Sequence, residues 1–257
     1  MLFAAGRAII EKNAPRPRRC RGRGGRGHTL KIAGLQKTTL LDFPGRVACT
    51  VFLSGCNFRC PFCQNGEILD GKEENYSREE FFAFLDKRKG ILDGVCVSGG
   101  EPLIHADIAA FLKGIKSRGY SVKLDTNGAF PEKLKELCAA GLVDFVAMDI
   151  KNSPQNYKKT AGADVNIDKI KESAAFLMQG DLPYEFRTTV VKELHRGEDF
   201  VRIGQWLRGA KRYFLQTFRD SESVLQKGLT PCSDSEMRAY KQLMKPFIPS
   251  VLIRGEE

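Results

Sequence analysis

Short apolar runs rich in β-branched residues alternate along this chain with amphipathic stretches of helical period. Each run has the length of a buried strand, and each stretch is long enough for a helix. The predicted strands are 47–53, 94–98, 121–126, 143–149, 184–191 and 213–218, with a short last strand at 250–253; the predicted helices are 78–89, 106–118, 131–140, 166–179, 199–209 and 233–245. Strands that alternate with helices predict an α/β fold with a parallel sheet, curved into a partial (β/α)6 barrel.

Five residues mark the expected ends of these helices. Ser77 followed three residues later by Glu80 has the spacing of a helix-capping box, and Pro131 suits a first helical turn. Asp199 is expected near a helix start, and Gly141 is expected to stop the helix before it.

Polar clusters follow the predicted strands where each strand ends. The segments are Cys56–Cys63 after the first strand, Ser98–Pro102 after the second, Asp125–Gly128 after the third and Asp149–Lys151 after the fourth, while Arg187 lies within the fifth. In parallel α/β folds, the carboxyl ends of the strands build the active site. Independent polar clusters at successive strand ends therefore predict one functional site.

The first of these clusters places Cys56, Cys60 and Cys63 in a C-x3-C-x2-C run. Three thiolates can hold three irons of a four-iron cluster, which leaves the fourth iron open for chemistry. The alternative is a zinc site, but structural zinc sites use four ligands, usually in two pairs, and no second C-x2-C exists here. The remaining cysteines are scattered: Cys20, Cys49, Cys96, Cys138 and Cys232. This usage is typical of a reducing cytoplasm, which we expect as the compartment.

Composition and charge then limit the partners. The 257 residues are 42% hydrophobic and 28% charged, and no apolar run approaches the roughly 18 residues of a membrane span, so we expect no membrane partner. The net charge is +10, but residues 1–28 carry +7 of it, so the remainder gives little reason to expect nucleic acid. We expect residues 1–28 to be a disordered basic tail and 29–257 to be one domain. The tail has three open interpretations: a solvated or over-extended start, a nucleic-acid-binding arm, or a targeting segment.

The cysteine run, with Phe62 before its last cysteine, resembles the C-x3-C-x-aromatic-C signature of the radical S-adenosylmethionine (SAM) superfamily. The resemblance implies one [4Fe–4S] cluster on Cys56, Cys60 and Cys63, with SAM chelating the open iron. It also implies reductive cleavage of SAM to methionine and a 5′-deoxyadenosyl radical. Phe62 would then pack near the adenine, although a simple core aromatic is the other interpretation of this residue.

The segment Ser98-Gly99-Gly100-Glu101 resembles the Gly-Gly-Glu motif of the same superfamily. The resemblance implies that it contacts SAM. Glycines let a backbone approach a ligand closely, and Glu101 could accept a hydrogen bond from the SAM ammonium. Taken alone, Gly-Gly-Glu-Pro is also a common turn.

The segments Asp125-Thr126-Asn127-Gly128 and Met148-Asp149-Ile150-Lys151 are similar to motifs of glycyl-radical-enzyme activases. The resemblance implies that Asp125 and Asp149 hold a monovalent cation beside the SAM carboxylate, and that Asp125 and the adjacent Thr126 contact the cofactor. It also implies that Lys151 and Arg187 lie near the SAM carboxylate. The alternative is a turn aspartate and strand-end ion pairs.

Three further segments narrow the resemblance to one subgroup, the longer form of the anaerobic ribonucleoside-triphosphate reductase activating protein. They are Gly34–Gly45, Cys63-Gln64-Asn65 and Arg187–Val190, and the similarity ends near Ile253–Gly255. The resemblance implies that Gln64 also contacts the cofactor, that the partner is a glycyl-radical enzyme, and that a flavodoxin or ferredoxin-type protein supplies the electron. No side chain beyond the cluster need act as an acid or base.

The chain also departs from these relatives. A histidine found near the end of the sixth strand in pyruvate formate-lyase activases is missing from 216–219, and 64–95 contain no cysteine, which predicts a single cluster. His195 is expected to be a solvated loop residue. Three other functions stay open: activation of another glycyl-radical enzyme such as pyruvate formate-lyase, radical chemistry on a small molecule such as a deazapurine precursor, and a metal-binding module that contacts RNA.

Overall fold

The structure is a computed structural model that describes residues 30–256, so the predicted tail at 1–28 lies outside the described residues. Its contacts group the chain into two compact units. Unit 1 contains 30–57, 67–125 and 137–144, and unit 2 contains 58–66, 126–136 and 145–256. The single domain expected over 29–257 stays a prediction.

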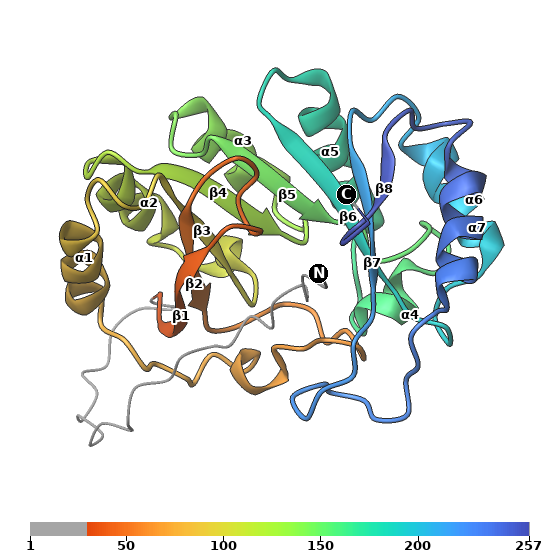
Figure 1. Ribbon diagram of the computed structural model, residues 1–257, viewed down its shortest axis with the longest axis horizontal. Coiled ribbons are helices and arrows are strands. Elements are labelled where there is room, and N and C mark those ends of the chain that lie inside the picture. The colour runs from red at the N-terminus through yellow and green to blue at the C-terminus, as the bar shows by residue number, and fades with distance from the viewer. Residues whose placement is uncertain (1–29, 257) are drawn as a thin grey trace. The chain divides into compact units, whose positions relative to one another are not determined.

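Unit 1 contains a sheet of mostly parallel strands (Figure 1). Its strands are β1 (Ile32–Thr39), β2 (Ala48–Leu53), β3 (Gly94–Gly99) and β4 (Ser121–Thr126). β2, β3 and β4 pair in parallel, whereas β1 runs antiparallel to β2. β2 is buried along its whole length, as expected for an apolar strand inside an α/β fold. The antiparallel strand β1 was not predicted.

Two helices pack together in unit 1, α1 (Arg78–Lys87) and α2 (Ile108–Lys116). The rings of Phe81 and Phe111 lie 5.3 Å apart, which joins the apolar faces of the two helices. The predicted capping box is confirmed: the backbone N–H of Glu80 donates to Ser77 Oγ, and that of Ser77 donates to the Glu80 carboxylate. The helix α3 (Pro131–Ala139) starts at the predicted proline, and Gly141 follows it with φ +65°.

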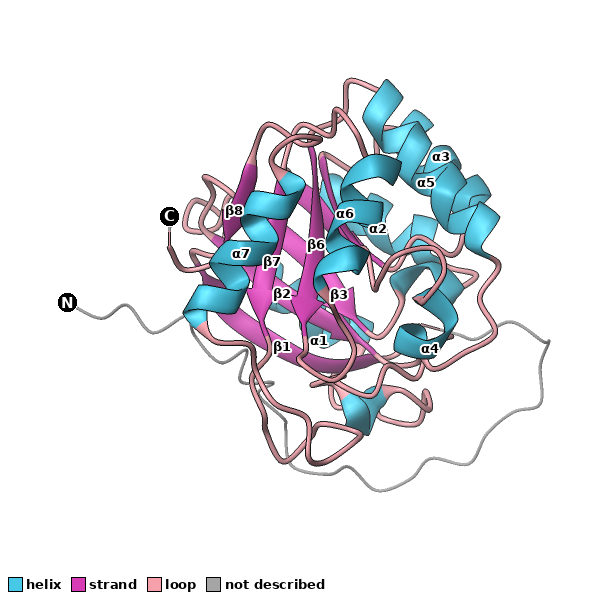
Figure 2. Cartoon of the chain, turned by 90° about the vertical axis from the view of Figure 1, so that its right-hand side faces the viewer, coloured by secondary structure: helices cyan, strands magenta, loops and turns pink. Residues whose placement is uncertain are grey.

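Unit 2 contains four parallel strands and four helices. The strands are β5 (Phe145–Asp149), β6 (Tyr184–Val190), β7 (Tyr213–Thr217) and β8 (Val251–Ile253), and the helices are α4 (Tyr157–Ala161), α5 (Ile167–Gln179), α6 (Gly197–Trp206) and α7 (Asp234–Met244). Figure 2 shows α6 and α7 side by side over one face of β6–β8. The short helix α4 was not predicted.

The predicted α/β class is confirmed, and the predicted parallel pairing holds for the described strand pairs except β1 with β2. Each predicted strand agrees with an observed one to within two residues at either end. The polar segments of the sequence follow these strands in both units, so the site is described next from each unit in turn.

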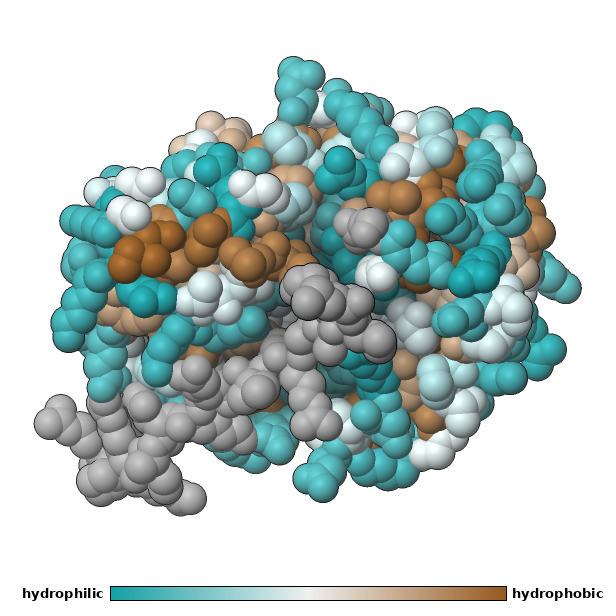
Figure 3. Space-filling view, viewed as in Figure 1, coloured by the Kyte–Doolittle hydropathy of each residue, from teal (hydrophilic) through white to brown (hydrophobic). Residues whose placement is uncertain are grey.

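The visible surface is mainly hydrophilic, with hydrophobic residues in small separate groups (Figure 3). Large exposed hydrophobic side chains among the described residues are Leu40, Leu41, Ile91, Leu225 and Leu243. Between residues 30 and 256, we find no helix with the length and apolar character that crossing a membrane requires.

Candidate functional site

Cys56 lies in unit 1, in the loop that follows β2. Backbone hydrogen bonds fix the loop on the segment before α1: Gly55 N–H donates to the Ile68 carbonyl at 2.7 Å, and Cys56 N–H donates to the Leu69 carbonyl at 3.0 Å. The hydroxyl of Ser54 donates to the same Ile68 carbonyl at 3.2 Å. The position of the cysteine is thus set by main-chain contacts.

The Gly99-Gly100 segment packs directly against this cysteine loop. Glu101 N–H donates to the Gly55 carbonyl at 2.9 Å, and Gly100 N–H donates to the Leu53 carbonyl at 2.8 Å. A Cβ atom at Gly100 would lie 1.9 Å from the Gly55 oxygen, and Gly99 has φ +115°. Only glycine fits at these two positions, because one is sterically closed and the other has a left-handed backbone.

Glu101 is fully buried, and its carboxylate accepts a hydrogen bond from Leu103 N–H at 3.0 Å. It thereby caps the short 3-10 helix Pro102–Ile104 that follows the glycines. The carboxylate holds the turn in shape, and the predicted contact with the SAM ammonium stays a prediction.

Asp125, at the end of β4, is the last of the predicted site residues that belong to unit 1. Its Oδ2 accepts a hydrogen bond from Ser98 Oγ at 3.0 Å, and its Oδ1 pairs with the ammonium of Lys123. Lys123 is 1% exposed and was not singled out from the sequence. The signal that could have found it is a lysine two positions before a motif aspartate within an apolar strand, because residues i and i+2 share one face of a strand.

Thr126 and the two residues after it begin the unit 2 part of the chain after β4. Thr126 is buried, and its Oγ1 accepts a hydrogen bond from Gly128 N–H at 3.1 Å. Asn127 Oδ1 accepts from Ala129 N–H at 3.0 Å. These contacts shape a turn, and the cofactor role predicted for Thr126 stays a prediction.

The loop with Cys60 and Cys63 belongs to unit 2 and is held from two sides. Arg59 N–H donates to the Ala161 carbonyl at the end of α4, at 2.9 Å, and Gln226 N–H donates to the Pro61 carbonyl at 2.9 Å. Cys63 N–H donates to the Cys60 carbonyl at 3.0 Å, which makes a tight turn between the two thiols.

Gln64, predicted to contact the cofactor, is exposed and uses its side chain within unit 2. Its Nε2 donates to the Arg219 carbonyl at 2.9 Å, and Ser223 Oγ donates to the Gln64 carbonyl at 2.6 Å. These bonds tie the cysteine loop to the segment after β7. The predicted cofactor contact of Gln64 stays a prediction.

Asp149, Lys151 and Arg187 form a charged cluster at the ends of β5 and β6. Asp149 and Arg187 are register partners, and Arg187 Nε donates to Asp149 Oδ1 at 2.9 Å. Lys151 Nζ donates to Asp149 Oδ2 at 3.1 Å and lies 5.9 Å from the ring centroid of buried Phe62. The predicted strand-end residues of unit 2 are therefore brought together, with two positive groups around one carboxylate.

Burial and the positive charge of Lys151 have opposite effects on the pKa of Cys60 and of Cys63. Burial raises the pKa of Cys60 to about 11, and the positive charge of Lys151 opposes that rise. Burial also raises the pKa of Cys63, while the Asn65 N–H and Lys151 oppose it. Burial favours a neutral Lys151, but Asp149 and Cys60 hold the pKa of this amine above its usual value. Lys151 therefore stays charged and favours the thiolate forms that metals bind.

The donor chemistry fits an iron–sulfur cluster. Cys56, Cys60 and Cys63 are not joined in disulfides among the described residues, and soft thiolates are the ligands of such clusters. Within residues 30–256, no group of three or more histidine, cysteine, aspartate or glutamate side chains is already arranged around a metal position.

The expectation that His195 is a solvated loop residue is wrong. Its side chain is 1% exposed, Val191 N–H donates to His195 Nδ1 at 3.1 Å, and Nε2 lies 2.9 Å from the Lys151 carbonyl. A neutral ring with its proton on Nε2 satisfies both contacts. His195 thus ties the loop after β6 to the backbone of Lys151, a role that depends on loop geometry and carries no sequence signal.

Acidification should weaken the fold through this histidine. Burial lowers the pKa of His195 below its usual 6.5. Below that pH the unfolded chain binds a proton that the folded chain does not, so the unfolding free energy should fall by up to about 1.4 kcal/mol per pH unit until the folded pKa is reached. Urea unfolding of the apoprotein at about pH 7.5 and 5.5 measures this, and His195→Gln should show a shallower pH dependence. Equal slopes in the two proteins would contradict the assignment.

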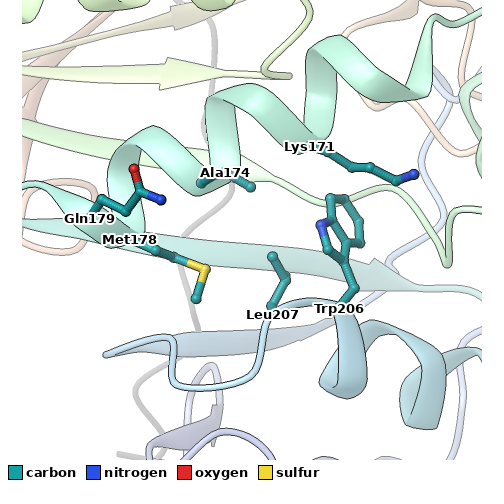
Figure 4. Close-up of a pocket in the computed structure, with 7 residues that line it drawn as sticks. Lys171, Ala174, Met178, Gln179, Trp206 and Leu207 are labelled. Atoms are coloured by element: carbon teal, nitrogen blue, oxygen red, sulfur yellow. The ribbon is translucent and has the colours of Figure 1, made fainter.

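A separate pocket in unit 2 has none of these residues in its wall (Figure 4). It lies between α5 and the end of α6 and has a volume of about 330 Å³. The side chains of Ala174, Met178 and Leu207 make its floor apolar, with Lys171 beside Trp206 at one end. It brings together no acids, thiols or histidines, so it is not a catalytic candidate.

Comparison with known proteins shows similarity over most of the chain. The model of the Radical SAM superfamily matches residues 50–206. A Methanocaldococcus jannaschii protein named "Putative glycyl-radical enzyme activating enzyme MJ1227" is 28% identical over 230 residues, which cover 87% of this chain and 95% of that protein. The pyruvate formate-lyase-activating enzyme of Listeria monocytogenes serovar 1/2a is 32% identical over 200 residues, which cover 72% of this chain and 76% of that enzyme.

Solved structures show a similar fold. Coproporphyrinogen III oxidase (HemN) from Escherichia coli, described as a radical SAM enzyme, superposes with a TM-score of 0.56. The alignment covers 77% of this chain and 51% of that one at 13% identity, so it shows likeness of fold alone.

Proposed function

Because this chain belongs to the radical SAM superfamily, whose model matches more than half of it, we propose that it is an activase of a glycyl-radical enzyme. The observation that carries the proposal is the extent of the similarity to proteins named for that activity. One such alignment covers 95% of the relative, and another reaches 32% identity over 200 residues. The sequence similarity that supports this proposal therefore extends over most of the chain, beyond the cysteine motif.

The partner that we propose is an anaerobic ribonucleoside-triphosphate reductase. The support is the similarity of the Gly34–Gly45 segment and of the Arg187–Val190 segment to the activating proteins of that reductase. A pyruvate formate-lyase is the second candidate, because the Listeria relative is named for activating that enzyme.

Different residues of this chain would bind the cluster and the separate parts of SAM. Cys56, Cys60 and Cys63 would hold the [4Fe–4S] cluster, and the Gly99-Gly100 backbone would let SAM approach closely. Lys151 and Arg187 would offer positive charge to the SAM carboxylate, as charge-assisted hydrogen bonds require. Phe62, which lies beside Lys151, would give the adenine an apolar contact.

When bound, the cluster and SAM would supply one-electron chemistry. With an electron from a flavodoxin or ferredoxin-type donor, SAM and a partner glycine would give methionine, 5′-deoxyadenosine and a glycyl radical. The protein provides orientation and exclusion of water, which is the usual division between a cofactor and its protein. Lys151 also keeps its charge next to Cys60, so it would stabilise a thiolate ligand.

The test is an anaerobic assay of radical transfer. Cluster-loaded protein, SAM and a reduced donor are mixed with an anaerobic ribonucleotide reductase or a pyruvate formate-lyase, and the glycyl radical is measured by electron paramagnetic resonance. We expect one radical signal on the reductase, 5′-deoxyadenosine in matching amount, and a much smaller signal on the lyase.

One control and two contradicting outcomes complete this assay. A reductase whose radical glycine is replaced by alanine should give no signal, which assigns the spin to that residue. Cleavage of SAM without a protein radical on either partner would overturn the proposed activase function, and a radical on the lyase alone would overturn the proposed partner.

A further inference from the structure

The two aspartates that resemble ligands of a monovalent cation already have positive partners from the protein itself. In unit 1, Asp125 pairs with the Lys123 ammonium. In unit 2, Asp149 pairs with Lys151 and Arg187. Each carboxylate is thus already paired with a positive side chain, which bears on whether a metal cation would bind there.

The pair in unit 1 is built into strand β4. Lys123 and Asp125 are two residues apart, so their side chains share one face of the strand. Lys123 is 1% exposed, and its Nζ lies 3.8 Å from the sulfur of buried Cys96. A buried ammonium is costly unless it is paired, so the ion pair with Asp125 offsets part of the cost of burying Lys123.

The remaining oxygen of Asp125 is also engaged, because it accepts a hydrogen bond from Ser98 Oγ at 3.0 Å. A hard monovalent cation binds through oxygen atoms with negative or partial negative charge. At Asp125 such an ion would have to displace an ammonium of the same charge that is covalently attached two residues away. The attached group therefore has the advantage of a very high local concentration.

The charges in unit 2 also disfavour a metal cation, for a different reason. Asp149 contributes one negative charge, and Lys151 and Arg187 contribute two positive charges at 3.1 and 2.9 Å. The three side chains are net positive, which disfavours a further cation and favours an anionic group. The residues present at both carboxylates therefore do not fit an added monovalent metal ion.

We propose that the Lys123 ammonium takes the place of the monovalent cation at Asp125, so that this protein binds SAM without Na⁺ or K⁺. The inference rests on the SAM binding contained in the proposed function and is independent of the identity of the partner. It assigns Lys123 as a positioning residue that holds Asp125 and, through it, Ser98 at the end of β3.

The direct experiment uses the cluster-loaded wild-type protein. SAM affinity is measured by equilibrium dialysis in potassium chloride and in tetramethylammonium chloride at equal ionic strength, since general screening then stays the same. We expect the two dissociation constants to agree within about twofold, well inside the tenfold change that 1.4 kcal/mol represents. A loss of SAM affinity of about tenfold or more without potassium would overturn the proposal.

The variant Lys123→Met keeps the length of the side chain and removes its charge. We expect its SAM affinity in tetramethylammonium to fall by about tenfold or more, as for loss of a hydrogen bond to a charged group, and to recover in potassium or ammonium chloride. Lys116→Met is the control for removal of a paired lysine, because Lys116 pairs with Asp144, another aspartate of the same unit. Its SAM affinity should not depend on the salt.

A second variant tests whether the effect of Lys123→Met comes from a loss of stability. Lys123→Met combined with Asp125→Asn removes both charges and should restore stability without creating a cation requirement. A salt-independent SAM affinity in folded Lys123→Met would overturn the proposal, because Lys123 would then be structural only. If SAM is bound and cleaved in every salt but no glycyl radical forms, the activase function fails while this inference stands.

Discussion

Replacement of Cys60 by alanine should reduce SAM cleavage at least about 100-fold, to the level of protein without a cluster, because changes merely around metal ligands already cost 10–100-fold. Cys60 is one of three thiols in the motif, and no fourth cysteine lies within 64–95 to replace it. The iron content after anaerobic reconstitution should drop below the roughly four irons of the wild-type protein. Iron analysis and the yield of 5′-deoxyadenosine with dithionite and SAM measure both effects.

Cys232→Ala is the matched control for this variant. Cys232 is also a buried thiol of unit 2, but it lies beside Tyr240, away from the motif. Its loss should cost only a small cavity and leave iron and SAM cleavage unchanged. Brown, active Cys60→Ala protein would show that the three-cysteine ligand set is wrong.

Replacement of Gly100 by alanine should destabilise unit 1 and, at the same time, lower the iron content of the protein. The new Cβ would lie 1.9 Å from the Gly55 oxygen and 3.3 Å from the Cys56 Cβ. The clash is with backbone, which cannot move aside as a flexible side chain can. We expect a loss of unfolding free energy of about 3 kcal/mol or more, at the upper end for overpacked positions, and displacement of the cysteine loop.

Gly119→Ala separates this clash from the general effect of replacing a glycine. Gly119 is in the same unit, has φ +89°, and has no atom within 4 Å of an added Cβ. Its cost should be about 1–2 kcal/mol of backbone strain, with normal iron content. Urea unfolding and iron analysis compare the two proteins. Equal stability and equal iron in both would show that Gly100 is not a point of close backbone contact.

The strands of this fold could be predicted because their apolar runs are short and clearly bounded. β1 escaped prediction because Gly34 interrupts its apolar start and the polar residues Gln36 and Lys37 follow, both at least partly exposed. The helix α4 has only five residues, too few for a helical period to show. Tertiary contacts, and not local pattern, determine both elements.

Some features of the candidate site could likewise be predicted from the sequence, and others could not. Strand-end motifs placed Asp149, Lys151 and Arg187 together: Asp149 and Arg187 are register partners in β5 and β6, and Lys151 Nζ donates to Asp149 Oδ2. The burial of His195 could not be predicted, because a loop histidine is buried only if the loop folds back on the strand end. Lys123 could have been recognised, since its spacing from Asp125 places both on one face of β4.

The anchoring of the Cys60–Cys63 loop has a consequence for how the protein is made. Its contacts reach Ala161, Arg219 and Gln226, and the Gln64–Arg219 bond joins residues 155 positions apart. Contacts of such long range form only after the intervening chain exists and has folded. A nascent chain that has not yet emerged as far as residue 226 cannot hold this loop in its final form. Delivery of iron and sulfide to the folded loop should therefore follow synthesis of the chain at least as far as residue 226.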